Sequence, residues 1–246
     1  MNFVQNTPIF NKINVSGVQF RSNSAVYTAP FEHSKDSFST NPITDINALA
    51  QAARTNSKIA EILAEYKIPV KFNTKELEKL QQGHLKDTRL VAAKMYSALP
   101  ENIKSEVNLK DLQEAAMFHD YGKALIPEKI LNKEGKFNEK EKEIMELHSE
   151  LGYELLKGFG VNENVLQMIK YHHQTSEGSG YPAIGEDFSP NAGAQILSAA
   201  DKYSALREER SYKSAMSRDE ALKILYEDVK SGLITPEIYS ALEKAV

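Results

Sequence analysis

Three short stretches of the sequence place histidine or aspartate side chains in apolar surroundings. The chain has six histidines, and four of them lie in these stretches. Imidazole and carboxylate are ligands of divalent metal ions, and the absence of cysteine excludes a thiolate site. The residue types therefore predict a site that suits iron, manganese or zinc. The stretches are, in chain order, His119-Asp120, His148 and His172-His173.

The adjacent His119 and Asp120 suggest more than one metal ion. Neighbouring residues on a helix point about 100° apart, so both can reach one site only if it faces the edge between them. A carboxylate has two oxygens and can bridge two cations, which an imidazole cannot do. The pair is a sensible nucleus for a two-metal centre, although such a dipeptide is common by chance.

The other polar residues carry less information when each is taken alone. His148 lies on the apolar stripe of a predicted helix, where a hydrogen-bonded core histidine is the more frequent explanation. Gly152, one turn later, would let a partner approach closely. Asp201 follows an apolar run, and burying its carboxylate without a partner would cost several kcal/mol. Metal coordination would remove that cost, and so would a salt bridge to lysine or arginine.

Composition limits the possible classes of protein. At 246 residues the chain can bury a sizeable core, and its net charge of −4 argues against a general nucleic-acid binder. The absence of cysteine fits a reducing cytoplasm. No apolar run approaches the roughly 18 residues needed to cross a bilayer, and the N-terminus lacks the pattern of a signal peptide. We therefore expect a cytoplasmic protein that contacts neither duplex nucleic acid nor membrane.

The chain divides into three predicted regions. Residues 1–42 are rich in Asn, Ser and Thr and are interpreted as an irregular or disordered arm, with a short strand near Val15–Phe20. Residues 43–74 form an accessory helical segment that breaks near Asn56. Residues 75–246 form the main domain. No segment alternates convincingly between apolar and polar residues, so the predicted fold class is all-α.

Apolar periodicity and capping residues predict the helices of the main domain. One helix runs from about 74 to 99 with His84 in its middle, and the next ends at Gly122. Capping boxes are predicted at Asn138 and Ser217. Pro190 and Pro236 each follow a hydroxyl residue that is expected to cap a helix. The predicted ranges are 74–99, 110–121, 138–158, 161–173, 191–207, 217–230 and a last helix from 235.

The order of these residues along the chain resembles the HD-GYP branch of the HD superfamily of metal-dependent phosphohydrolases. This ordered set of motifs is specific, and it covers roughly residues 75–246. The resemblance implies the helical bundle of an HD domain. The matching segments are His119-Asp-Tyr-Gly-Lys123 and the following Ile126–Lys133, His172–Pro182, and Ala199-Ala-Asp201 through Arg210–Lys213.

The resemblance also implies an activity. Such proteins hydrolyse cyclic di-GMP with a metal-bridging hydroxide as nucleophile, so a small nucleotide substrate and two divalent metal ions are expected, with iron or manganese favoured over zinc. Asp120 would bridge the ions, and Lys123 would stabilise charge on the phosphoryl oxygens. Substrate contacts would come from Gly180, Tyr181, Arg210 and Lys213. The implied ligands are His84, His119, Asp120, His148, His172, His173 and Asp201.

Three positions depart from the family pattern. Gln174 stands where the family usually has glutamate, and metal binding could change if that residue orients a ligand. Ser204 stands where an acidic residue is common. Leu80 occupies the position of a glutamate that helps some members hold a third metal ion, so we predict two ions.

The departures leave other functions open. The chain could hydrolyse another nucleotide or phosphoester, which broad activity on mononucleotides would indicate. It could also be a catalytically silent regulator that binds a nucleotide or a protein partner, as Gln174 and Ser204 suggest. A protein partner or a homodimer is compatible with the sequence.

Overall fold

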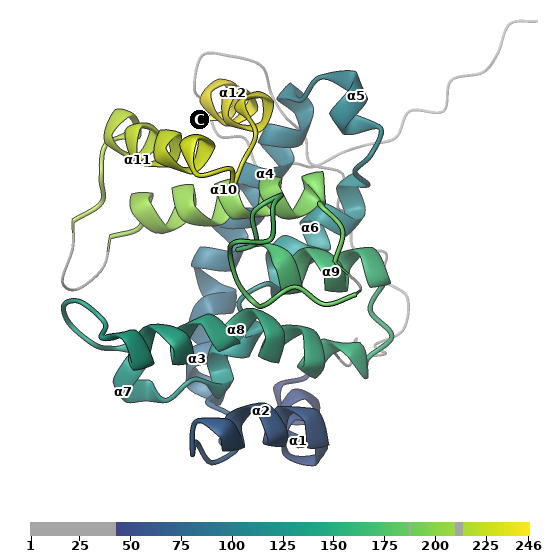
Figure 1. The fold of residues 1–246 in the computed structure, drawn as a ribbon, viewed down its shortest axis with the longest axis vertical. Coiled ribbons are helices and arrows are strands. Elements are labelled where there is room, and N and C mark those ends of the chain that lie inside the picture. The colour runs from purple at the N-terminus through teal and green to yellow at the C-terminus, as the bar shows by residue number, and fades with distance from the viewer. Residues whose placement is uncertain (1–42, 187, 210–213) are drawn as a thin grey trace, which may run out of the picture. The chain divides into compact units, whose positions relative to one another are not determined.

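The computed structural model describes residues 43–186, 188–209 and 214–246, and within these ranges the fold contains helices and no strand. This confirms the predicted all-α class. Figure 1 shows the elements in chain order. They are α1 (Ile46–Thr55), α2 (Ser57–Glu65), α3 (Thr74–Gln82), α4 (His84–Ala98), α5 (Glu101–Lys104), α6 (Leu109–Phe118), the 3-10 helix η1 (Tyr121–Leu125), α7 (Glu128–Leu131), α8 (Glu139–Lys157), α9 (Glu163–Tyr171), α10 (Ala192–Arg207), α11 (Arg218–Lys230) and α12 (Pro236–Ala245).

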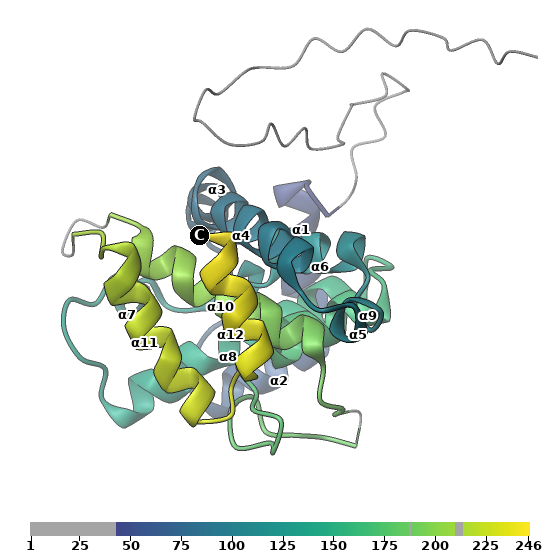
Figure 2. The same cartoon turned by 90° about the horizontal axis from the view of Figure 1, so that it is seen from above.

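Helix α4 is the central element of the bundle, because α6, α10 and α12 all pack against it. Helix α8 packs against η1 and α9, and α6 also contacts α9. Figure 1 shows α1 and α2 at the lower end of the bundle and α11 and α12 at the upper end, and Figure 2 shows the same helices from above. Leucine, isoleucine, alanine and methionine side chains from all these helices fill one continuous core.

Local capping explains where several helices begin. Asn138 and Ser217 each accept a hydrogen bond from the backbone three residues later, and Glu141 and Glu220 return one, so both predicted capping boxes are confirmed. Thr235 caps α12 through its hydroxyl. Asn56 caps α2, and its amide also donates to the Glu154 carbonyl of α8 at 2.9 Å. The predicted break near Asn56 is therefore confirmed.

Three predictions about helix boundaries were wrong. The helix predicted over 74–99 is broken at Gly83, so His84 is the first residue of α4 rather than the middle of a long helix. The helix predicted to end at Gly122 ends at Phe118, and Gly122 lies inside η1. The cap of α10 is Asn191, whose side chain accepts from the Ala194 amide, and not Ser189.

The predicted arm and its strand near Val15–Phe20 lie outside the described residues. The boundary at residue 74 stays a prediction, since α1 and α2 pack against α3 and α8. Among the described residues, no helix is both long enough and apolar enough to cross a membrane.

Candidate metal centre

Five helical segments bring the seven predicted ligands together in the bundle. His84 opens α4, His119 and Asp120 join α6 to η1, and His148 lies within α8. His172 and His173 follow α9, and Asp201 lies in α10. His173 is half-buried, and the other six residues are buried. Their ligand atoms form two groups, each with all ligand atoms within 4.8 Å of one another.

The first group contains His84, His119, Asp120 and Asp201, and is called here the acidic group. The Nε2 atom of His84 lies 2.8 Å from Oδ1 of Asp201 and 3.5 Å from Oδ2 of Asp120. The Nε2 atom of His119 lies 3.4 Å from Oδ1 of Asp201 and 3.5 Å from Oδ2 of Asp120. Two imidazoles and two carboxylates thus face one point.

The second group contains His148, His172 and His173, and is called here the histidine group. It is joined to the acidic group through Asp120, whose Oδ1 lies 3.6 Å from Nε2 of His148. The two oxygens of this one carboxylate therefore face different groups, as a bridging ligand requires.

Backbone carbonyls orient three of the imidazole rings. The Nδ1 atoms of His119, His148 and His172 lie 3.1, 2.7 and 2.7 Å from the carbonyl oxygen of the residue three positions earlier in each case. Donation from Nδ1 leaves the lone pair on Nε2. In the described part of the chain, these three Nε2 atoms are buried without a hydrogen-bond partner. Buried lone pairs without a partner, one in the acidic group and two in the histidine group, fit metal ions.

Electrostatics favour the metal-binding protonation state of three of these residues. Burial alone would raise the pKa of Asp120, but the Lys123 ammonium and the neighbouring imidazoles hold it well below its usual range. Burial lowers the pKa of His148 to about 4, assisted by Lys123. Burial and the nearby His119 and His148 rings lower the pKa of His172 to about 3. At neutral pH the carboxylate is charged and these imidazoles are neutral, which is the form that binds metal.

Lys123 forms an ion pair with Asp120. Its Nζ atom lies 2.6 Å from Oδ2 of Asp120, one turn earlier, and its side chain is partly buried. Tyr181 lies beside the histidine group. Its ring stacks on His173 with centroids 4.6 Å apart and lies 6.1 Å from the ring of His148.

Two glycines let the ligand-bearing segments approach each other. A Cβ atom on Gly122 would lie 1.9 Å from the carbonyl oxygen of His148 and 2.6 Å from the amide nitrogen of Gly152. A Cβ atom on Gly152 would meet the Gly122 amide at 3.4 Å. The close approach predicted at Gly152 is present, but Gly122 has the tighter contact. Its sequence signal was a helix break inside the segment His119–Lys123, which gives no indication of the partner helix.

The remaining predicted positions have other environments. Arg210 and Lys213 lie outside the described residues. Gly180 packs directly on the backbone of His173 and Gln174, where a Cβ atom would meet the His173 carbonyl oxygen at 2.1 Å. The Gln174 amide forms its hydrogen bonds with the loop that contains Gly180, so it has a function that the sequence did not reveal.

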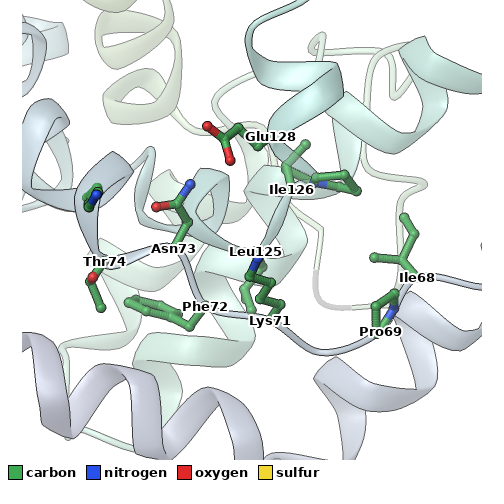
Figure 3. Close-up of a pocket in the computed structure, with 11 residues that line it drawn as sticks. Ile68, Pro69, Lys71, Phe72, Asn73, Thr74, Leu125, Ile126 and Glu128 are labelled. Atoms are coloured by element: carbon green, nitrogen blue, oxygen red, sulfur yellow. The ribbon is translucent and has the colours of Figure 1, made fainter.

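A cavity of about 470 Å³ opens elsewhere on the bundle, between the segment before α3 and the residues that follow η1 (Figure 3). Phe72 and Leu125 form part of its floor, and Lys71 and Glu128 lie at its edge. None of the seven predicted ligands lines it. The candidate centre is thus separate from this cavity.

Comparison with known proteins identifies relatives of this chain. It is 37% identical over 143 residues to the cyclic di-GMP phosphodiesterase response regulator RpfG of Xanthomonas campestris, covering 56% of this chain and 37% of the relative. It is 35% identical over 145 residues to a cyclic di-GMP phosphodiesterase of Thermotoga maritima, covering 57% and 38%. It is 33% identical over 135 residues to the 3′3′-cGAMP-specific phosphodiesterase 3 of Vibrio cholerae, covering 55% and 29%.

The chain spans only 29% to 38% of the length of each of these relatives. The HD domain family matches residues 70–238, which include all seven predicted ligands. The motifs of the chain resemble those of the HD-GYP branch, and the chain belongs to the HD domain family.

Proposed function

We propose that this chain is a metal-dependent phosphodiesterase that hydrolyses a cyclic dinucleotide, cyclic di-GMP, at a centre of two divalent metal ions. The observation that carries the proposal is the position of Asp120. Its two oxygens face two separate ligand groups, and the other six ligands converge around it. The relatives named as phosphodiesterases of cyclic dinucleotides support the substrate class.

The residues at the centre fit divalent cations. His148 and His172 have lowered pKa values and present Nε2 atoms without a hydrogen-bond partner in the described part of the chain, and the two carboxylates supply negative charge. When bound, two such cations supply an acidified water molecule as nucleophile and withdraw charge from the phosphoryl oxygens. Imidazole and carboxylate ligands suit iron, manganese and zinc alike, and we propose iron or manganese because the resemblance to the HD-GYP branch favours them.

The chain's own side chains add to this chemistry. The Lys123 ammonium neutralises Asp120 and would stabilise negative charge on the phosphoryl oxygens as the phosphodiester is attacked. The Tyr181 ring forms a flat apolar wall beside the histidine group, on which a purine base can stack. Arg210 and Lys213 are proposed to hold phosphate, the arginine through its planar fork of donors.

The test begins with protein purified from cells grown with iron and manganese. Metal per chain is measured on the same sample that is assayed on cyclic di-GMP, with chelated protein as the control. We expect metal in the purified protein, hydrolysis of the dinucleotide, and loss of both after chelation. Purified protein that retains its metal but leaves both cyclic di-GMP and 3′3′-cGAMP intact would contradict the proposal.

Two outcomes would point to the alternatives. Hydrolysis of mononucleotides with untouched cyclic dinucleotides would indicate a different phosphoester substrate. Tight binding of cyclic di-GMP without turnover under any metal would indicate a silent regulator. Ser204 is buried, and its hydroxyl oxygen has no hydrogen-bond partner in the described part of the chain. This environment does not distinguish between the two alternatives.

A further inference from the structure

The loop that follows the paired histidines is held by one buried side chain, Gln174, which is only 4% exposed. Its Oε1 atom accepts hydrogen bonds from the backbone amides of Thr175, at 3.0 Å, and of Gly180. Its Nε2 atom donates to the carbonyl oxygen of Pro182 at 2.7 Å. A single amide group therefore connects the beginning and the end of the loop.

These partners require an amide at this position. Two backbone donors face one end of the side chain, and one backbone acceptor faces the other. Turning the amide over would set its NH₂ group against two N–H groups. A carboxylate would satisfy both donors but could not donate to Pro182. Glutamine matches this loop, whereas an ionised glutamate would leave the Pro182 carbonyl without its donor.

The residue that the loop positions is Tyr181. Its backbone amide donates to the His173 carbonyl at 3.2 Å, and its ring stacks on the His173 ring with an angle of 26° between the planes. Gly180, immediately before it, lies against the backbone of His173 and Gln174 with no room for a side chain. The hydrogen bonds of Gln174 with Gly180 and Pro182 thus hold the residues on both sides of Tyr181.

A second buried glutamine fixes the base of the loop independently. Gln195 of α10 donates to the Ser176 hydroxyl at 2.8 Å and accepts from the Thr235 amide at 3.1 Å. The Ser176 amide also faces the Gly232 carbonyl at 3.4 Å. A substitution at Gln174 should therefore release the segment around Tyr181 while the base of the loop stays attached to α10 and α12.

We propose that Gln174 is a positioning residue that holds Tyr181 against His173, so that it acts on the wall of the substrate site and not on metal binding. The part that concerns substrate rests on the proposed phosphodiesterase function. The part that concerns the loop does not. The proposal as a whole replaces the expectation that glutamine in place of glutamate at position 174 changes the metal content.

The experiment compares Gln174→Glu, which keeps the acceptor and loses the donor, with Gln174→Met, which loses both. Gln51→Glu on the exposed face of α1 is the matched control. Three quantities are measured on metal-containing protein: hydrogen–deuterium exchange of the segment 175–183, metal per chain, and kcat and KM for cyclic di-GMP and for bis(p-nitrophenyl) phosphate. Thermal unfolding of each variant checks the global fold, and exchange in α12 is the internal reference.

Loss of a buried hydrogen bond should raise exchange in 175–183 about tenfold in Gln174→Glu and more in Gln174→Met, with α12 unchanged. Metal per chain should equal that of the unsubstituted protein. The kcat/KM for cyclic di-GMP should fall about tenfold in Gln174→Glu, mainly through KM, while the smaller phosphodiester changes less than about threefold. Gln51→Glu should match the unsubstituted protein throughout.

Unchanged exchange in both Gln174 variants would overturn the proposal, and so would loss of metal in parallel with activity. If the unsubstituted protein hydrolyses neither substrate, the phosphodiesterase function fails. Exchange and metal content would still decide whether Gln174 positions the loop.

Discussion

The acidic group and the histidine group differ in the types of side chain that form them. The acidic group has two carboxylates, Asp120 and Asp201, whose pKa values are held below their usual range by neighbouring imidazoles and, for Asp120, by Lys123, against the effect of burial. The histidine group has three imidazoles with lowered pKa values and shares only one oxygen of Asp120.

Because their ligands differ, the two groups are expected to differ in their affinity for a divalent cation. The carboxylates of the acidic group can compensate the charge of one ion within the buried site. An ion in the histidine group has only the shared Asp120 to compensate it, and charge that is uncompensated in a buried site is unfavourable. We therefore expect tight binding in the acidic group and weaker binding in the histidine group.

The largest effect should come from Asp120→Ala, because this side chain belongs to both groups. Metal per chain should fall at least about tenfold, and hydrolysis should be lost. Metal analysis of the purified variant is the measurement. Asp111→Asn is the control, since Asp111 is another buried carboxylate of α6 and faces Asn162 and Asn164 at 3.5 Å. An Asp120→Ala protein with full metal content would show that the carboxylate does not bridge.

Lys123→Met should separate catalysis from metal binding. The lysine competes with a cation for Oδ2 of Asp120, so its removal should leave the metal content intact and tighten binding in the acidic group. Turnover should fall about 100-fold if the ammonium stabilises charge on the phosphoryl oxygens. Steady-state kinetics at saturating metal measures this. Unchanged turnover would leave Lys123 with a purely structural role.

Gly122→Ala should weaken the histidine group selectively. The new Cβ atom would collide with the backbone of α8 at His148 and Gly152, and such overpacking costs about 1–3 kcal/mol of unfolding free energy. Thermal unfolding and metal analysis should show a lower Tm and partial metal loss. Gly158→Ala, at a position with nothing within 4 Å, should change neither quantity by much. Equal behaviour of the two variants would refute the close contact.

The smallest effect is the difference between the two groups themselves. Titration with a chelator should remove metal in two phases separated by about tenfold or more in chelator concentration, since about 1.4 kcal/mol of binding free energy corresponds to that factor. In His172→Ala the phase at low chelator concentration should disappear, while the phase at high concentration remains. A single phase in the unsubstituted protein would mean that the groups bind equally.

Local signals explain why much of this fold could be predicted from the sequence. The capping boxes at Asn138 and Ser217 involve residues three positions apart, so the pattern and the structure report the same contact. The order of the histidine and aspartate motifs likewise picked out the seven residues whose side chains form the two groups. In contrast, Gly83 lies within a continuous helical pattern, and its unusual backbone angles depend on how α3 and α4 pack.

Contacts across the bundle could not be predicted in the same way. The clash that a side chain at Gly122 would cause depends on where α8 lies. The hydrogen bonds of Gln174 depend on the path of a loop that returns after eight residues to Pro182. Both residues could be recognised in the sequence as departures or breaks, but the partner that gives each its function is visible only in three dimensions.

The carbonyl groups that orient His119, His148 and His172 have a consequence for mutational robustness. Each ring is oriented by the peptide oxygen of Ala116, Met145 or Ile169, within its own helical turn. Every amino acid carries that oxygen, so no substitution at these three positions can delete the acceptor. Substitutions at these three positions can therefore change the side chains behind the imidazole rings, while the carbonyl oxygen that orients each ring is kept.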